Sequence, residues 1–193
     1  NQGGVNVFKG GEDHLLNDVF RHWVGGLVHH ARAISLLGSL FGNGYKRVRP
    51  YSFCPTHVHW GGDNRSVLCR CTVGQGQANR VEYRGGGADA NPYLILAGIL
   101  AAGADGLERQ LDPGPPATGD LYEDPGDHEA LPATFADGIA AFRDSELAGS
   151  LGADFSTNLL ALVSNELTLY EANASDGDDS VSAWEFDRYV EFT

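Results

Sequence analysis

The sequence has no methionine and only two lysines, Lys9 and Lys46, so its other cationic side chains are all arginines. Positive charge is scarce overall, because 13 lysines and arginines stand against 26 acidic residues and give a formal net charge of −13. A surface with this balance repels the phosphates of nucleic acids and the headgroups of anionic membranes. We therefore expect no nucleic acid and no membrane among the partners.

Cysteine is rare and long hydrophobic runs are missing. The three cysteines, Cys54, Cys69 and Cys71, cannot form a complete set of disulfides, and they contain no CxxC spacing. The most membrane-like stretch, residues 92–104, is shorter than the roughly 20 residues that cross a bilayer. These features predict reduced thiols in a cytoplasmic protein.

The opening residues, Asn1-Gln2-Gly3-Gly4, have the composition of a loop tip inside a fold. Together with the lack of methionine, they favour a piece of a longer protein. A length of 193 residues is enough for one packed domain and does not require two. We therefore expect one unit that is part of a larger chain.

The pattern of apolar residues predicts an α+β fold, in which an antiparallel sheet packs with helices. Apolar steps of three and four predict a long amphipathic helix over residues 12–42, ended by Gly42 and Gly44. The β-branched run 66–73 and residues 80–84 predict two strands of an antiparallel hairpin. A long loop rich in proline, glycine and aspartate follows at 112–130, and then three helices at 132–144, 154–173 and 182–192.

Asn91 and Pro92 predict the start of a further helix, with Asn91 as the N-cap and Pro92 at the first helical position. The residues from Tyr93 to Leu100 place apolar side chains on every side of this helix. We therefore expect it to be buried.

The predicted hairpin carries the first sign of chemistry. Residues two apart on a strand share a face, so Arg80, Glu82 and Arg84 project together. Other arginines lie close by in the sequence: Arg47, Arg49, Arg65 and Arg70. One reading is a solvent-exposed edge with a self-paired ion cluster. The other is a site for a polyanion and a hard metal ion, Mg²⁺ or Mn²⁺, since so many arginines in an acidic chain call for anions to hold.

Several motifs then appear in a fixed order: Asn43-Gly-Tyr-Lys-Arg47, Ser52-Phe-Cys-Pro-Thr56, Trp60-Gly-Gly-Asp-Asn-Arg-Ser66, Arg80-Val-Glu-Tyr-Arg84, Ala88-Asp-Ala-Asn-Pro-Tyr-Leu94 and Trp184-Glu-Phe-Asp-Arg-Tyr-Val190. In these motifs the chain resembles the C-terminal half of a glutamine synthetase. The resemblance covers most of residues 5–112 and extends to a helical tail. It implies that residues 1–193 are the C-terminal portion of a glutamine synthetase-like catalytic domain.

The resemblance also implies a role for each matching side chain. The roles are metal ligation by Glu82, contact with the transferred phosphoryl group by Arg65, nucleotide binding by Arg70 and Arg80, and substrate glutamate binding by Arg47 and Arg84. The implied cofactors are ATP and Mg²⁺ or Mn²⁺. Such roles are chemically coherent, because phosphoryl transfer depends on positioning and fixed positive charge, and arginine binds carboxylate and phosphate bidentately.

The family reaction proceeds through a γ-glutamyl phosphate, from which an amine displaces phosphate. Where ammonia-using members carry a flap glutamate that binds ammonium, this sequence has Phe53. A phenyl ring accepts no proton, and the change resembles the γ-glutamylpolyamine synthetase branch. We therefore predict an organic amine or polyamine as the nucleophile. Glutamine synthesis from ammonia is the alternative.

The resemblance implies further parts that this chain does not hold. Other metal ligands would precede Asn1, and a small N-terminal domain would close the site from a neighbouring subunit of a homo-oligomeric, dodecamer-like ring. We therefore expect the 193-residue chain alone to be inactive. A fragment or family member kept as a structural or assembly protein is the alternative of another class.

Four other features carry weaker signals. His57 and His59 have a metal-ligand spacing but are more typical of packing or of a surface. His29 and His30 are predicted to be structural. Tyr122 falls where some bacterial relatives are adenylylated, and a plain loop tyrosine is the favoured interpretation. The polar turn 176–179 lacks the rest of a calcium loop.

Overall fold

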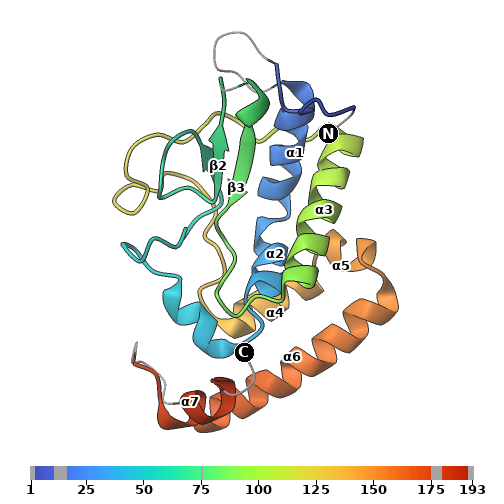
Figure 1. The fold of residues 1–193 in the computed structure, drawn as a ribbon. Helices are drawn as coiled ribbons and strands as arrows, with labels where there is room; N and C mark the ends of the chain where they lie inside the picture. The colour runs from blue at the N-terminus through green and yellow to red at the C-terminus, as the bar shows by residue number, and fades with distance from the viewer. Residues whose placement is uncertain (1–2, 11–16, 75, 175–179, 191–193) are drawn as a thin grey trace.

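The computed structural model describes residues 3–10, 17–74, 76–174 and 180–190. It confirms the α+β class, because a small sheet lies beside a group of helices (Figure 1). Helix α1 (Asp18–His29) and helix α3 (Pro92–Arg109) run side by side, and the sheet stands on the flank of this pair. None of the helices in the described part of the chain is long and apolar enough to span a bilayer.

The sheet contains the predicted hairpin. Strand β2 (Cys69–Thr72) pairs antiparallel with strand β3 (Arg80–Tyr83), and the short strand β1 (Trp60–Gly61) adds a parallel pairing on the other side of β2. Cys69 and Cys71 share the buried face of β2, as their spacing predicts, and all three cysteines are free. The opposite face of the hairpin is more exposed and carries the charged side chains.

Helices α1 and α3 approach each other through glycine. A Cβ atom on Gly26 would collide with the carbonyl of Ala102, and one on Gly106 would collide with the carbonyl of His22. Only glycine allows two backbones to pack this closely. The buried residues of α3 are therefore small ones, Gly98, Ala102, Gly103 and Gly106.

The expectation that the whole of α3 is buried is wrong. Its N-cap Asn91 and first residue Pro92 are as predicted, and the Asn91 side chain accepts hydrogen bonds from the next turn. Three of its large apolar side chains, however, face outward, with Tyr93 82%, Leu96 55% and Leu100 59% exposed, while the others in its first half are partly buried against the core. The close glycine contact with α1 turns the small side of α3 inward and leaves these three side chains in solvent.

The single helix predicted over residues 12–42 is divided. Helix α1 ends at His29, helix α2 (Ala31–Gly38) follows, and Gly42–Arg47 forms a short 3₁₀ helix, η1. The break lies at His30, whose buried ring places Nε2 2.8 Å from Asp105 of α3. Helix α2 ends where the carbonyl of Gly38 accepts a hydrogen bond from Gly87 instead of from its own helix. Residues 12–16 lie outside the described residues.

Helices also follow the long loop. The structure contains α4 (Phe135–Arg143), α6 (Ala153–Asn173) and α7 (Ala183–Tyr189), as predicted, and adds a short helix, α5 (Glu146–Ser150). Helix α7 folds back against α6 at one end of the molecule (Figure 1). Buried Glu185 joins this pair to η1 through an ion pair with Lys46 at 2.8 Å. The predicted turn at 176–179 lies outside the described residues.

Candidate active site

Glu82 lies between two arginines on the exposed face of the hairpin. Its cross-strand partner is Arg70, whose Nη1 is 3.5 Å from Oε2 of Glu82. On the other side, Nε of Arg84 is 3.4 Å from Oε1. Both ion pairs are long, and the Glu82 side chain remains 49% exposed. The carboxylate is therefore positioned by its neighbours but still accessible to a cation from solution.

Arg70 has an incomplete set of partners. It forms an ion pair with Asp63 through Nη2, while its Nε is buried and has no hydrogen-bond partner in the structure as described. A buried N–H group without an acceptor costs free energy. An anion bound beside the hairpin would supply that acceptor.

Arg84 holds three chain segments together. Its side chain is only 12% exposed. Nη1 donates to the carbonyls of Arg65 and Val67, the latter at 3.1 Å, and Nη2 donates to the carbonyl of Phe53 at 2.9 Å. Three of the five guanidinium N–H groups are thus used to fix loops around the hairpin. The segments that carry Arg65 and Phe53 are tied to β3 by this one side chain.

The remaining predicted arginines surround the same region. Arg47, in η1, donates from Nη1 to the carbonyl of Gly85 at 3.3 Å, next to Arg84. Arg65 is exposed on the loop before β2. Arg80 is exposed at the start of β3, two residues before Glu82, and donates to Ala78 at 3.1 Å. The structure therefore brings all six predicted side chains to the hairpin and the loops that border it.

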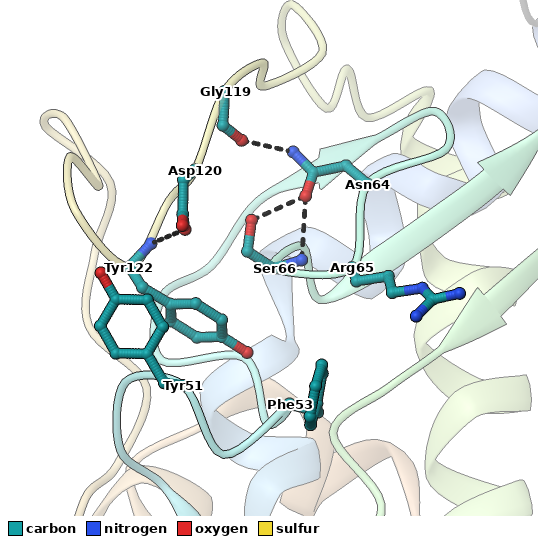
Figure 2. Close-up of a pocket in the computed structure, with 8 residues that line it drawn as sticks. All are labelled: Tyr51, Phe53, Asn64, Arg65, Ser66, Gly119, Asp120 and Tyr122. Carbon is teal, nitrogen blue, oxygen red and sulfur yellow. Dashed lines mark hydrogen bonds between the residues drawn. The ribbon is translucent and has the colours of Figure 1, made fainter.

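A cavity of about 410 Å³ opens beside this cluster. It is lined by Tyr51, Phe53, Asn64, Arg65, Ser66, Gly119, Asp120 and Tyr122 (Figure 2). Three of these side chains are aromatic, one is a cation and one is an anion. Figure 2 shows Phe53 between the two tyrosines on one side and Arg65 on the other. The cavity thus has an aromatic end and an arginine end.

Two polar side chains fasten the walls of the cavity to each other. The Oδ1 atom of Asn64 accepts hydrogen bonds from the backbone and hydroxyl of Ser66, and its Nδ2 donates to the carbonyl of Gly119 at 2.9 Å. The Ser66 hydroxyl accepts from the backbone N–H of Leu121 at 3.2 Å. The loop that carries Arg65 is therefore bonded to the loop that carries Asp120 and Tyr122.

The aromatic end is built on unusual backbone. Tyr51 and Phe53 have φ values of 61° and 60°, a region that bulky residues rarely adopt. Both side chains are largely exposed, at 63% and 67%. Tyr122 packs against Tyr51, with ring centroids 5.4 Å apart, and its hydroxyl donates to the carbonyl of Cys54 at 2.9 Å. Desolvation raises the pKa of Tyr122, so this phenol stays neutral at physiological pH.

Of the two histidines with metal-ligand spacing, His59 is buried and His57 is partly exposed. His59 is 1% exposed, and its ring meets His128 edge to face at 5.3 Å. Burial, with help from the neighbouring His128, lowers the pKa of His59 to about 4. His29, His30 and Glu146 do lie close together, but Arg109 already contacts Glu146 at 2.6 Å. A guanidinium there provides the charge that a metal would bring.

Comparison with known proteins identifies the fold around this site. Residues 1–189 match the family model described as the glutamine synthetase catalytic domain. The chain belongs to the glutamine synthetase family.

Individual relatives agree with that assignment. A glutamine synthetase of Halobacterium salinarum is 33% identical over 196 residues, which cover 97% of this chain and 42% of that protein. The gamma-glutamylethanolamide synthetase GlnA4 of Streptomyces coelicolor is 36% identical over 177 residues, 91% of this chain and 36% of that protein. A solved structure of apo GmaS without ligand superposes with a TM-score of 0.77 at 31% identity, covering 96% of this chain and 41% of that one. The chain thus spans about two fifths of the length of these relatives.

Within this family fold, the donor set on the hairpin fits one part of a metal site. Mg²⁺ and Mn²⁺ prefer oxygen ligands, and the half-exposed carboxylate of Glu82 offers one. The surrounding guanidinium groups suit phosphate rather than metal. Glu82 is therefore suited to be one ligand of an ion that also contacts a phosphate.

Sequence reasoning missed part of the site. Asn64, Ser66 and Asp120 line the cavity, but none was predicted as a site residue. Asn64 and Ser66 belong to the same short motif as Arg65, which was a usable signal. Asp120 gave no signal, because it lies in the long loop and reaches the cavity only through tertiary contacts.

Proposed function

We propose that residues 1–193 form the C-terminal portion of the catalytic domain of an ATP-dependent ligase that joins glutamate to an amine. The observation that supports this most strongly is Glu82 between Arg70 and Arg84, beside a cavity lined by Arg65 and Phe53. The rest of the catalytic domain would supply the other metal ligands. Below, "the complete enzyme" means residues 1–193 joined to that remaining part.

In the first step, the γ-phosphoryl group of ATP moves to a side-chain oxygen of glutamate, and ADP leaves. We assign the nucleotide phosphates to Arg70 and Arg80 and the phosphoryl group in transfer to Arg65. Fixed guanidinium groups stabilise the charge that spreads over the phosphoryl oxygens. Glu82 would hold one Mg²⁺ or Mn²⁺ ion, which neutralises phosphate charge when bound.

Glutamate itself would be held by Arg47 and Arg84. Arg47 lies at the edge of the cluster, where its Nη1 reaches the carbonyl of Gly85. Three N–H groups of Arg84 already bind backbone carbonyls, so only its remaining N–H groups would contact glutamate. Arg84 would thus position the loops and contact the substrate at the same time.

In the second step, the amine nitrogen attacks the acyl carbon of γ-glutamyl phosphate, phosphate leaves, and the amine loses a proton to give the amide. Phe53 lines the cavity where this nucleophile would enter. Its ring offers no carboxylate to form an ion pair with ammonium or to accept its proton, but the methylenes of a longer amine gain about 0.8 kcal/mol for each CH₂ group that is fully buried. We therefore propose an organic amine or polyamine as the substrate.

We also propose a cytoplasmic location and a homo-oligomeric ring as the working assembly. The three cysteines are free and buried, and burial raises the pKa of Cys71 to about 12, so its thiol is inert. The ring rests on family membership alone. Its test is the mass of the complete enzyme in solution, because a monomer of full activity would disprove it.

The function is tested by ATP turnover in the complete enzyme. ADP release is measured with glutamate and each of four nucleophiles: ammonia, ethanolamine, putrescine and spermine. We expect amine-dependent release, with an organic amine giving a higher kcat/KM than ammonia. A clear preference for ammonia would establish plain glutamine synthesis instead. Absence of glutamate-dependent release with all four would favour a structural or assembly role.

A further inference from the structure

We propose that Asp120 and the aromatic end of the cavity bind the distal ammonium group of a diamine or polyamine, so that the site selects amines by their second positive charge. This inference rests on the proposed ligase function and adds a specificity-determining residue to it. It names the part of the molecule that recognises the nucleophile, whereas Phe53 explains only why ammonia is disfavoured.

The cavity has two chemically different ends. Arg65 lies at one end and is assigned to the phosphoryl group, so the reacting nitrogen of the amine must approach that end. Tyr51 and Tyr122 lie on the other side of Phe53 from Arg65, and Asp120 lies beyond Asn64 and Ser66, next to the backbone of Tyr122 (Figure 2). An amine whose first nitrogen reacts near Arg65 therefore extends its chain across the cavity towards Asp120.

The carboxylate of Asp120 is available to a ligand. Its Oδ1 accepts the backbone N–H of Tyr122 at 2.9 Å, and this bond fixes the direction of the side chain. Its Oδ2 has no hydrogen bond among those the structure gives for the described residues. Asp120 is the one acidic residue among the eight that line the cavity. It is thus the natural counter-ion for a cation bound there.

The aromatic walls suit the same cation. Tyr51 and Tyr122 contact each other with ring centroids 5.4 Å apart, and Phe53 is 67% exposed. Aromatic faces attract ammonium groups and also pack against methylenes. Desolvation raises the pKa of Tyr51, and the carboxylates of Glu123 and Asp120 raise it further, so the negative potential of this loop reaches the ring.

The shape of the site separates classes of amine. Ammonia would fill little of a cavity of about 410 Å³. A monoamine or an amino alcohol would fill more of it but would bring no charge to Asp120. A diamine gains the apolar contact and the ion pair together. The expected order of kcat/KM is therefore diamine, monoamine of equal length, and ammonia.

The test compares putrescine with n-butylamine, which has the same carbon chain without the second amine. Both are assayed in the complete enzyme with saturating ATP and glutamate at one pH. In the wild type, putrescine should exceed n-butylamine by about tenfold in kcat/KM, the worth of one charge-assisted hydrogen bond. Asp120→Asn should remove that advantage through KM. Its amide oxygen still accepts the Tyr122 N–H, so the loop keeps its turn.

Asp124→Asn is the matched control. Asp124 lies in the same loop and also accepts a backbone N–H, from Gly126 at 3.1 Å, but it does not line the cavity. This variant should keep the preference for putrescine. A melting temperature of Asp120→Asn equal to that of the wild type shows that the variant is folded.

The outcomes separate this inference from the proposed function. Equal kcat/KM for the two amines in the wild type, or a preference that persists in Asp120→Asn, overturns the role of Asp120 while the ligase stands. Absence of turnover with every amine disproves the ligase. In that event the affinity for putrescine is measured by calorimetry. Binding that weakens about tenfold in Asp120→Asn supports the site. Absence of binding overturns it.

Discussion

The hairpin and the cavity beside it are built in opposite ways. The charged face of the hairpin follows from strand alternation, which puts Arg80 and Glu82 on one side of β3 and Arg70 opposite Glu82. The cavity is assembled from three loops that are separate in the sequence, around Phe53, Arg65 and Asp120. Paired strands therefore carry Glu82, Arg70 and Arg80, the groups assigned to the metal and the nucleotide, whereas loops carry Arg65 and the groups assigned to the amine.

This division has a chemical consequence. Phosphoryl transfer requires charges fixed in one geometry, which paired strands provide. The choice of amine requires a pocket that can differ between relatives, and loops vary without disturbing the core. Changes in the hairpin should therefore affect turnover with every amine, and changes in the cavity should affect which amine is used.

The largest effect is expected from Glu82→Gln in the complete enzyme. A neutral amide is a poor ligand for Mg²⁺, so ATP turnover should fall to background with every amine. Because Glu82 is half exposed and its ion pairs are long, the melting temperature should change little. Glu108→Gln, on the exposed side of α3, is the control and should behave as the wild type. Full activity in Glu82→Gln would remove Glu82 from the metal site.

Arg65→Gln should come next. Loss of one guanidinium from the transferred phosphoryl group is expected to lower kcat by roughly 10³-fold. Arg65 also lines the cavity, so this variant tests whether its main role is in the chemistry. A uniform loss of kcat for ammonia, ethanolamine and putrescine would place it with the hairpin. A loss for putrescine alone would place it with the amine pocket. Arg143→Gln, exposed on α4, controls for the lost charge.

The same contrast explains what could be predicted from the sequence. The hairpin and the N-cap of α3 were predictable because alternation and capping are local rules. The break at His30 was not, since the apolar pattern runs through it; the His30 ring there contacts Asp105, 75 residues away. The outward side of α3 was not predictable either, because glycine contacts with α1 decide which side faces in. The family resemblance assigned roles to the arginines, whereas the place of Asp120 in the cavity could be seen only in the folded structure.

Arg84 joins the two regions, so its loss should affect both. Arg84→Lys keeps the charge but cannot bind the carbonyls of Phe53, Arg65 and Val67 together. With hydrogen bonds from a largely buried guanidinium removed, we expect a loss of about 3 kcal/mol in the free energy of unfolding. Denaturant unfolding of the complete enzyme measures this. Arg80→Lys is the control, because Arg80 is exposed and its side chain donates to a carbonyl two residues away. Equal stability of the two variants would mean that Arg84 does not hold the loops.

The smallest effect is expected from Phe53→Glu, which changes the cavity and leaves the hairpin intact. A carboxylate at this position attracts ammonium and accepts a proton, so kcat/KM for ammonia should rise relative to putrescine by about tenfold. Phe53→Leu is the matched control, because it also removes the ring from a position with positive φ but adds no charge. The ratio of ADP release with ammonia to that with putrescine gives the result.

A shift of this ratio in Phe53→Glu but not in Phe53→Leu would show that the charge at residue 53 sets the nucleophile. A shift of equal size in both variants would mean that only the bulk of the ring excludes ammonia. An unchanged ratio in both would remove Phe53 from amine selection and leave that role to Asp120 and the tyrosines.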